Sequence, residues 1–147
     1  MQRFGQNGTW LDPTIQSFRY WAPTQWDVIF AGFKKVAVQI RQAKVNVLTG
    51  TDWSTSPQEK ESLPGASLHD ELALLADAGF SSPEILRAAT LSPALFLGLS
   101  DSLGTVERGK IANLVLLEAN PIEDIHNTRG IVAVVLEGRI IVDRSTR

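Results

Sequence analysis

The pattern of apolar and polar positions predicts a strand, a helix and a second strand at the start of the chain. Residues 9–16 contain Thr, Trp and Ile, which favour strands, and Pro13 indicates where that strand ends. From Trp26 to Ile40 the apolar residues recur at helical spacing, with basic residues mostly on the opposite side. Residues 45–52 are a short β-rich run that ends in Gly and an acid. Because the helical crossover is long enough, we expect the two strands to pair in parallel.

Two or three further helices are predicted after an irregular loop at residues 53–66. Ser67 is the expected cap of the first helix, because Asp70 follows it in the capping-box position and Gly79 supplies a stop signal. Residues 82–84 (Ser-Pro-Glu) are typical of a second helix start, since proline is tolerated at the first helical position.

The pattern changes to β-rich from Gly104 onward. The dipeptide Glu137-Gly138 is a two-residue hairpin signal, which predicts that the last two strands are antiparallel neighbours. The expected strands of this part are residues 113–117, 132–136 and 139–142.

Composition excludes several classes of partner. Hydrophobic residues make up 44% of the 147 residues and charged residues 20%, which is typical of a globular protein. The formal charge is −2, and Lys and Arg form no dense run, so we expect no nucleic-acid partner and no binding to an anionic membrane. No run of about 18 apolar residues is present, so no membrane span is expected. Residues 1–8 lack the apolar core of a signal peptide. We expect a cytoplasmic protein, although the start of this chain is uninformative about a longer parent.

The residue types available restrict the chemistry of any metal site. The chain has no cysteine, which excludes disulfides, thiolate nucleophiles and thiolate metal ligands. Its two histidines are His69 and His126. Any metal site built by this chain would therefore depend on carboxylates.

Asp52 is the strongest candidate for a functional residue. It ends the run Thr-Gly-Thr-Asp at the carboxyl end of the second predicted parallel strand, where α/β proteins usually bind their ligands. Gly50 permits close backbone approach there, and the flanking threonines could hydrogen-bond the carboxylate. Such an aspartate suits metal ligation or proton abstraction from water. The alternative is that Asp52 only caps the following turn, as aspartate often does.

The remaining candidates favour structural roles. A lone histidine beside acids, such as His69, usually only forms hydrogen bonds, and His126 is expected to be solvated. Asn7 begins a glycosylation sequon that has no meaning without secretion. Aromatic residues close to a helix start are usually core residues, although they could line a pocket: these are Trp10, Trp21 and Trp26.

Several runs of the sequence resemble the C-terminal third of the amidohydrolase superfamily and occur in the same order as there. They are most similar to its imidazolonepropionase-like and dipeptidase-like branch. The likeness extends over nearly the whole chain. It is carried by the runs at residues 48–52, 68–72, 76–81, 88–94, 104–115, 120–125 and 134–139.

This resemblance implies an α/β fold that is a fragment of a (β/α)₈ TIM-type barrel. Residues 1–100 would hold the last two strands and helices of the barrel, and residues 101–147 part of a small β-sandwich domain. A complete barrel needs roughly 250 residues. The chain would therefore supply about two of the eight strands.

The resemblance also implies a site and a cofactor. Asp52 matches the family's aspartate at the end of the eighth strand, which is a metal ligand and a proton shuttle. The divalent metal, zinc by expectation, would need the histidines and the carboxylated lysine or glutamate of earlier strands, which this chain lacks. We therefore expect no metal to be held by this chain alone. Asn113 replaces an aspartate that is usual in the family's small β-domain.

Three functions remain open on the sequence. The chain could be an inactive C-terminal part of an enzyme that hydrolyses carbon–nitrogen bonds in small amides, cyclic amides or dipeptides. It could be a non-catalytic binding or assembly module. It could also be one half of a split enzyme, completed by an N-terminal partner chain or by homo-oligomerisation. Since two barrel strands leave open sheet edges, we expect the isolated chain to be oligomeric, partly molten or bound to the missing part.

Overall fold

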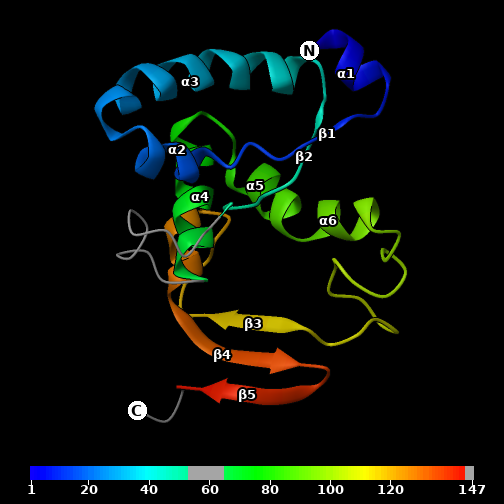
Figure 1. Cartoon of the computed structure of the whole chain (residues 1–147). Helices are drawn as coiled ribbons and strands as arrows, with labels where there is room; N and C mark the ends of the chain where they lie inside the picture. The colour runs from blue at the N-terminus through cyan, green and yellow to red at the C-terminus, as the bar shows by residue number, and fades with distance from the viewer. Residues whose placement is uncertain (53–64, 145–147) are drawn as a thin grey trace.

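The computed structural model describes residues 1–52 and 65–144 and shows a mixed α/β protein. Helix α3 lies at one end of the molecule with the short α1 beside it, and a three-stranded sheet lies at the other end, with α2, α4, α5 and α6 between them (Figure 1). The predicted loop falls on residues 53–64, outside the described residues. The elements in chain order are α1 (Gln2–Gln6), β1 (Trp10–Leu11), α2 (Ile15–Trp21), η1 (Pro23–Gln25), α3 (Trp26–Gln42), β2 (Asn46–Val47), α4 (Ala66–Asp77), α5 (Ser82–Ala89), α6 (Leu91–Phe96), β3 (Leu114–Leu117), η3 (Ile125–Arg129), β4 (Ile131–Leu136) and β5 (Arg139–Asp143).

The predicted strand–helix–strand unit is confirmed. Strands β1 and β2 pair in parallel, with Trp10 opposite Asn46 and Leu11 opposite Val47. The N–H of Leu48 donates to the carbonyl oxygen of Leu11 at 2.9 Å, which extends the pairing beyond the strands. Both strands therefore run in the same direction, and their carboxyl ends lie side by side.

One apolar core joins the helices to this strand pair. Helix α3 contributes Ala37 and Ile40, both at most 1% exposed, as its helical spacing predicts. Leu75 of α4 and Ile85 of α5 are also 1% exposed and belong to the same cluster. Ile125 of η3 joins it from the C-terminal part of the chain. Burying such side chains contributes roughly 1.5–3 kcal/mol each.

The buried carboxyl group of Glu71 caps helix α2 from a distant part of the chain. Oε1 accepts the N–H of Ile15 at 2.9 Å, and Oε2 accepts the N–H of Gln16 at 2.8 Å. These are two of the N–H groups that a helix start leaves without an intrahelical partner. The expected extended segment at residues 9–16 is wrong at its end, because the strand itself is confined to Trp10–Leu11 and this cap allows a helix to begin at Ile15.

Burial acts on the pKa of Glu71. Desolvation raises that pKa to about 7, against the lowering effect of the N–H groups of Gln16 and Ile15, and the charge of Asp12 raises it further. The charged form is thus costly here, although the helix N-terminus favours an anion.

The helix start signals were correct for α5 and wrong for α4. The N–H and Oγ of Ser81 both donate to Oε2 of Glu84, at 2.8 and 2.7 Å, in a capping box that fixes the start of α5. Helix α4 instead begins after Gly65, whose φ of 85° suits glycine. Ser67 lies within α4 and is 2% exposed, so it is not the cap.

Strands β3, β4 and β5 form an antiparallel sheet in that order, as Figure 1 shows. The predicted hairpin is confirmed, since Glu137 and Gly138 both have positive φ, at 50° and 79°. Oδ1 of Asn113 accepts the N–H of Glu137 at 2.8 Å, so this asparagine holds the hairpin turn. All five residues of β5 are exposed.

Helix α4 is joined to η3 by polar contacts. Nδ1 of His69 lies 2.9 Å from Oγ1 of Thr128, and Nη2 of Arg129 lies 2.5 Å from Oδ1 of Asp70. Burial lowers the pKa of His69, the nearby Arg129 lowers it further, and Asp70 opposes both. The neutral imidazole is therefore favoured at this contact.

None of the helices in residues 1–52 and 65–144 combines the length and the apolar character that crossing a bilayer requires.

The pKa of Glu71 predicts a pH-dependent stability. Because the folded-state pKa, about 7, exceeds the unpaired value of 4.5, the folded chain binds more protons between these values. The free energy of unfolding should therefore fall by about 3 kcal/mol as the pH rises from 4.5 through 7. The change Glu71→Gln removes this titration and one N–H acceptor, so it should cost about 1–2 kcal/mol at pH 5 and much less at pH 7.5.

Urea denaturation followed by circular dichroism at several pH values measures this difference. The exposed Asp101 supplies a matched control, and Asp101→Asn should keep the wild-type pH dependence. Equal pH slopes in the wild type and in Glu71→Gln would contradict the assignment to Glu71.

Candidate functional site

Asp52 lies beyond the carboxyl end of β2, as the sequence predicted. Its side chain is exposed, and its backbone is left-handed, with a φ of 48°. An L-residue in this region carries a conformational cost, and aspartate tolerates the region better than most residues. Asp52 is therefore presented to solvent at the strand end where parallel α/β proteins place their chemistry.

A second aspartate, from the carboxyl end of β1, holds the segment that carries Asp52. Oδ1 of Asp12 accepts the N–H of Gly50 at 2.8 Å. A Cβ atom at Gly50 would collide with the Asp12 carboxylate, so a larger residue here would have to displace that carboxylate. The contact joins the ends of the two parallel strands. Sequence reasoning missed Asp12, although it follows its strand as Asp52 follows β2.

The expected support of Asp52 by Thr49 is wrong. Oγ1 of Thr49 is buried and has no hydrogen-bond partner among the described residues. It faces the interior while Asp52 faces solvent, so the two side chains do not meet. Buried hydroxyl groups are nearly always hydrogen-bonded, which makes Thr49 Oγ1 an exception at this strand end.

The described residues fit one ligand of a metal site and not a complete set. Within residues 1–52 and 65–144, no group of three or more His, Asp or Glu side chains is placed to hold a metal ion. The carboxylate of Asp12 is engaged with Gly50, whereas that of Asp52 is exposed. Because a catalytic metal needs about three protein ligands, Asp52 would require donors from elsewhere.

The two histidines have hydrogen-bond partners other than Asp52 among the described residues. His69 contacts Thr128 in the junction between α4 and η3, which agrees with a structural role. The side chain of His126 is 58% exposed, as expected, and its Nδ1 lies 2.8 Å from Oδ1 of Asp124.

The three tryptophans have different surroundings. Trp10 packs edge-on against Phe96 with ring centroids 5.7 Å apart, and Trp26 stacks on Phe30 at 5.0 Å. Trp21 is 58% exposed. Trp10 and Trp26 thus act as packing residues, and Trp21 leaves an apolar surface on α2.

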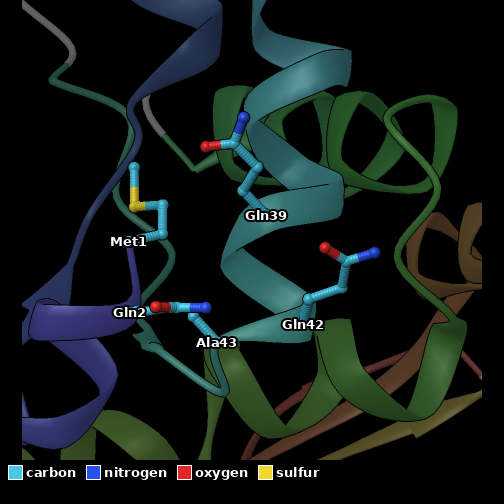
Figure 2. A pocket seen from close by; sticks show the side chains of 5 residues that line it. All are labelled: Met1, Gln2, Gln39, Gln42 and Ala43. Carbon is cyan, nitrogen blue, oxygen red and sulfur yellow. The ribbon is translucent and has the colours of Figure 1, made fainter.

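A hollow of about 230 Å³ lies between α1 and the end of α3 (Figure 2). Its polar lining consists of amide side chains, which do no acid–base chemistry near neutral pH. Ala43 precedes β2, so this hollow lies toward the amino end of that strand, away from Asp52. The residues that line it are Met1, Gln2, Gln39, Gln42 and Ala43.

Comparison with known proteins identifies relatives of the chain. Residues 27–141 match the model of the amidohydrolase family. The imidazolonepropionase of Thermoplasma acidophilum is 39% identical over 67 residues, which are 44% of this chain and 16% of that protein.

Two solved structures share the fold over most of this chain. A Xaa-Pro dipeptidase with bound methionine in the active site superposes with a TM-score of 0.76 and 23% identity, over 93% of this chain and 35% of that chain. Phenylurea hydrolase B superposes with a TM-score of 0.66 and 30% identity, over 92% of this chain and 32% of that chain. The chain thus spans about a third of these structures and a smaller share of the imidazolonepropionase.

The family match covers more than half of the chain, includes the β2–Asp52 segment and extends into β5. The chain belongs to the amidohydrolase family.

Proposed function

We propose that this chain is the C-terminal part of a metal-dependent amidohydrolase that hydrolyses carbon–nitrogen bonds in small amides, cyclic amides or dipeptides. The observation that carries the proposal is Asp52, exposed at the carboxyl end of a parallel strand and supported by the contact between Asp12 and Gly50. Residues 1–100 would form the last two strands and helices of a TIM-type barrel, and residues 101–147 part of a β-sandwich.

Asp52 would have two roles in the complete enzyme. Its carboxylate would contribute one ligand to a divalent metal, with zinc as our expectation, and the metal would supply Lewis-acid activation when bound. Asp52 would also accept a proton from the attacking water and pass it to the leaving nitrogen as the carbon–nitrogen bond breaks. The Asp52 carboxylate is exposed and therefore accessible for both roles, whereas the Asp12 carboxylate is engaged with the Gly50 N–H.

The remaining ligands would come from outside this chain, so the chain alone would be inactive. Apolar side chains on the helical part are exposed, which supports the proposal that another segment packs there in the complete enzyme. Phe18 is 45% exposed, Trp21 58% and Val28 78%. Among the described residues, β1 and β2 pair only with each other, which leaves an open edge on each strand. We propose a complementing N-terminal segment as the neighbour, with self-association as the alternative.

Bound-metal stoichiometry, measured by plasma mass spectrometry, tests the first part of the proposal. The purified chain and its Asp52→Asn variant should both carry close to no metal, because one carboxylate is not a metal site. A tightly bound ion in the wild type that is lost in Asp52→Asn would show that the chain builds a complete site and would overturn the proposed inactivity.

Complementation tests the catalytic role of Asp52. The chain would be mixed with the part of the Xaa-Pro dipeptidase that it does not cover, in the presence of zinc, and assayed on an Xaa-Pro dipeptide and on phenylurea. We expect hydrolysis only in the mixture and a loss of about 10²–10⁴-fold with Asp52→Asn, the usual contribution of a proton-transfer group. The exposed Asp101→Asn should leave the activity unchanged. A mixture that forms a complex and hydrolyses equally well with Asp52→Asn would contradict the proposed role.

Gly50→Ala tests the support of the Asp52 segment. The added methyl group would displace the Asp12 carboxylate and break its hydrogen bond with the Gly50 N–H. We expect a loss of roughly 1.5–3 kcal/mol in the free energy of unfolding, the range for hydrogen bonds to charged groups.

Gly32→Ala is the matched control, since nothing lies within 4 Å of a Cβ atom at that position and the residue is inside helix α3. It should stabilise the helix by up to about 1 kcal/mol. Equal stability of wild type and Gly50→Ala in urea denaturation would mean that Asp12 does not hold this segment.

A further inference from the structure

A second cavity, of about 250 Å³, lies among the end of α3, strand β2 and helix α5. Lys44, Val45 and Asn46 belong to its lining and precede or begin β2, so the cavity lies toward the amino end of that strand. Asp52 follows the carboxyl end of the same strand. The cavity is therefore separate from the proposed catalytic end, and what binds in it does not depend on the proposed function.

The charged residues that line this cavity leave a positive surplus. Arg41, Lys44 and Arg87 are cations, and Glu84 is the one carboxylate of the lining. Arg41 is already engaged: its Nε lies 3.4 Å from Oε1 of Glu84, and its Nη1 donates to the carbonyl oxygen of Gly79 at 2.8 Å. The side chains of Lys44 and Arg87 form no hydrogen bond or ion pair with any described residue. Two positive charges thus remain available, on a chain whose formal charge is −2.

The other side of the cavity is apolar. Val45, Phe80 and Ala88 line it and are at most 9% exposed, and Ile40, also in the lining, is 1% exposed. An apolar wall beside two available cations matches a ligand with an apolar body and one anionic group. The volume is below the roughly 300–1,000 Å³ of sites for drug-sized ligands, so the ligand must be small.

We propose that this cavity binds a small organic anion, with the apolar body against Phe80 and Val45 and the carboxylate or phosphate group near Lys44 and Arg87. Arginine and lysine are the side chains that usually bind carboxylate and phosphate oxygens. The other reading is that both cations only complement the carbonyl ends of their helices, α3 and α5. That reading predicts a contribution to stability and no response to a particular anion.

A substitution at Lys44 can distinguish these two readings, because the backbone there is left-handed. Its φ is 52°, a left-handed conformation that costs roughly 1–2 kcal/mol for an L-residue and nothing for glycine. Lys44→Gly should therefore raise the free energy of unfolding while it removes a cation from the cavity. A variant that is more stable and binds the anion less tightly supports a binding role, because unfolding would then not explain the lost affinity.

Titrations followed by amide chemical shifts in NMR test the proposal on the 147-residue chain. The probes are phenyl phosphate, benzoate, inorganic phosphate and the neutral benzyl alcohol, at constant ionic strength set with chloride. We expect saturable shifts at residues 44–47 and 87–88 with phenyl phosphate or benzoate, and the stronger of the two identifies the anionic group. Inorganic phosphate and benzyl alcohol should each bind at least about tenfold more weakly, since each lacks one half of the ligand.

Variants complete the test. Lys44→Gly and Arg87→Gln should each weaken binding of the better probe by about tenfold, roughly 1.4 kcal/mol. Lys35→Gln removes an exposed cation of α3 that does not line the cavity and should have no effect. Shifts that do not saturate, equal binding of inorganic phosphate, or unchanged affinity in both Lys44→Gly and Arg87→Gln would each overturn the proposal.

Discussion

The two hydrogen bonds that the Glu71 carboxyl group accepts from Ile15 and Gln16 connect segments more than fifty residues apart in the chain. They start helix α2 directly after β1, and so they determine where the chain turns toward α3. Ile15 itself is 2% exposed and packs in the same core as Leu75, which lies one helical turn beyond Glu71. The buried carboxyl group of Glu71 thus joins α4 to the start of α2. Its burial makes the charged form costly, which raises its pKa.

The proposed catalytic end depends on this arrangement. Because β1 leaves the sheet at a defined point, Asp12 can reach across to the Gly50 N–H and hold the segment that presents Asp52. Three carboxyl groups thus have three different surroundings. Glu71 caps a helix, Asp12 holds a strand end, and Asp52 remains exposed to solvent. Their environments, and not their residue type, separate these roles.

The two parts of the molecule are joined by more than the connecting chain. Ile125 of η3 enters the helical core, and the contacts of His69 with Thr128 and of Arg129 with Asp70 hold η3 against α4. The sheet of β3, β4 and β5 has much exposed apolar surface, with Ile140 at 64% and Leu116 at 59%. Apolar sheet faces normally pack against a second layer. That surface agrees with a chain that spans only about a third of the solved structures it resembles.

Local patterns along the sequence were sufficient for the elements whose signals are local. The spacing of α3, the start of α5 at residues 82–84 and the Glu137-Gly138 turn were predicted, because each depends on residues within a few positions of one another. Asp52 could be placed at a strand end for the same reason, while its metal ligation and the division at residue 101 stay predictions. Only the tertiary structure decided that Ile15 starts a helix, that Asp12 supports Gly50 and that Lys44 and Arg87 share a cavity. Those outcomes depend on contacts between residues about forty to sixty positions apart, whose approach no local pattern encodes.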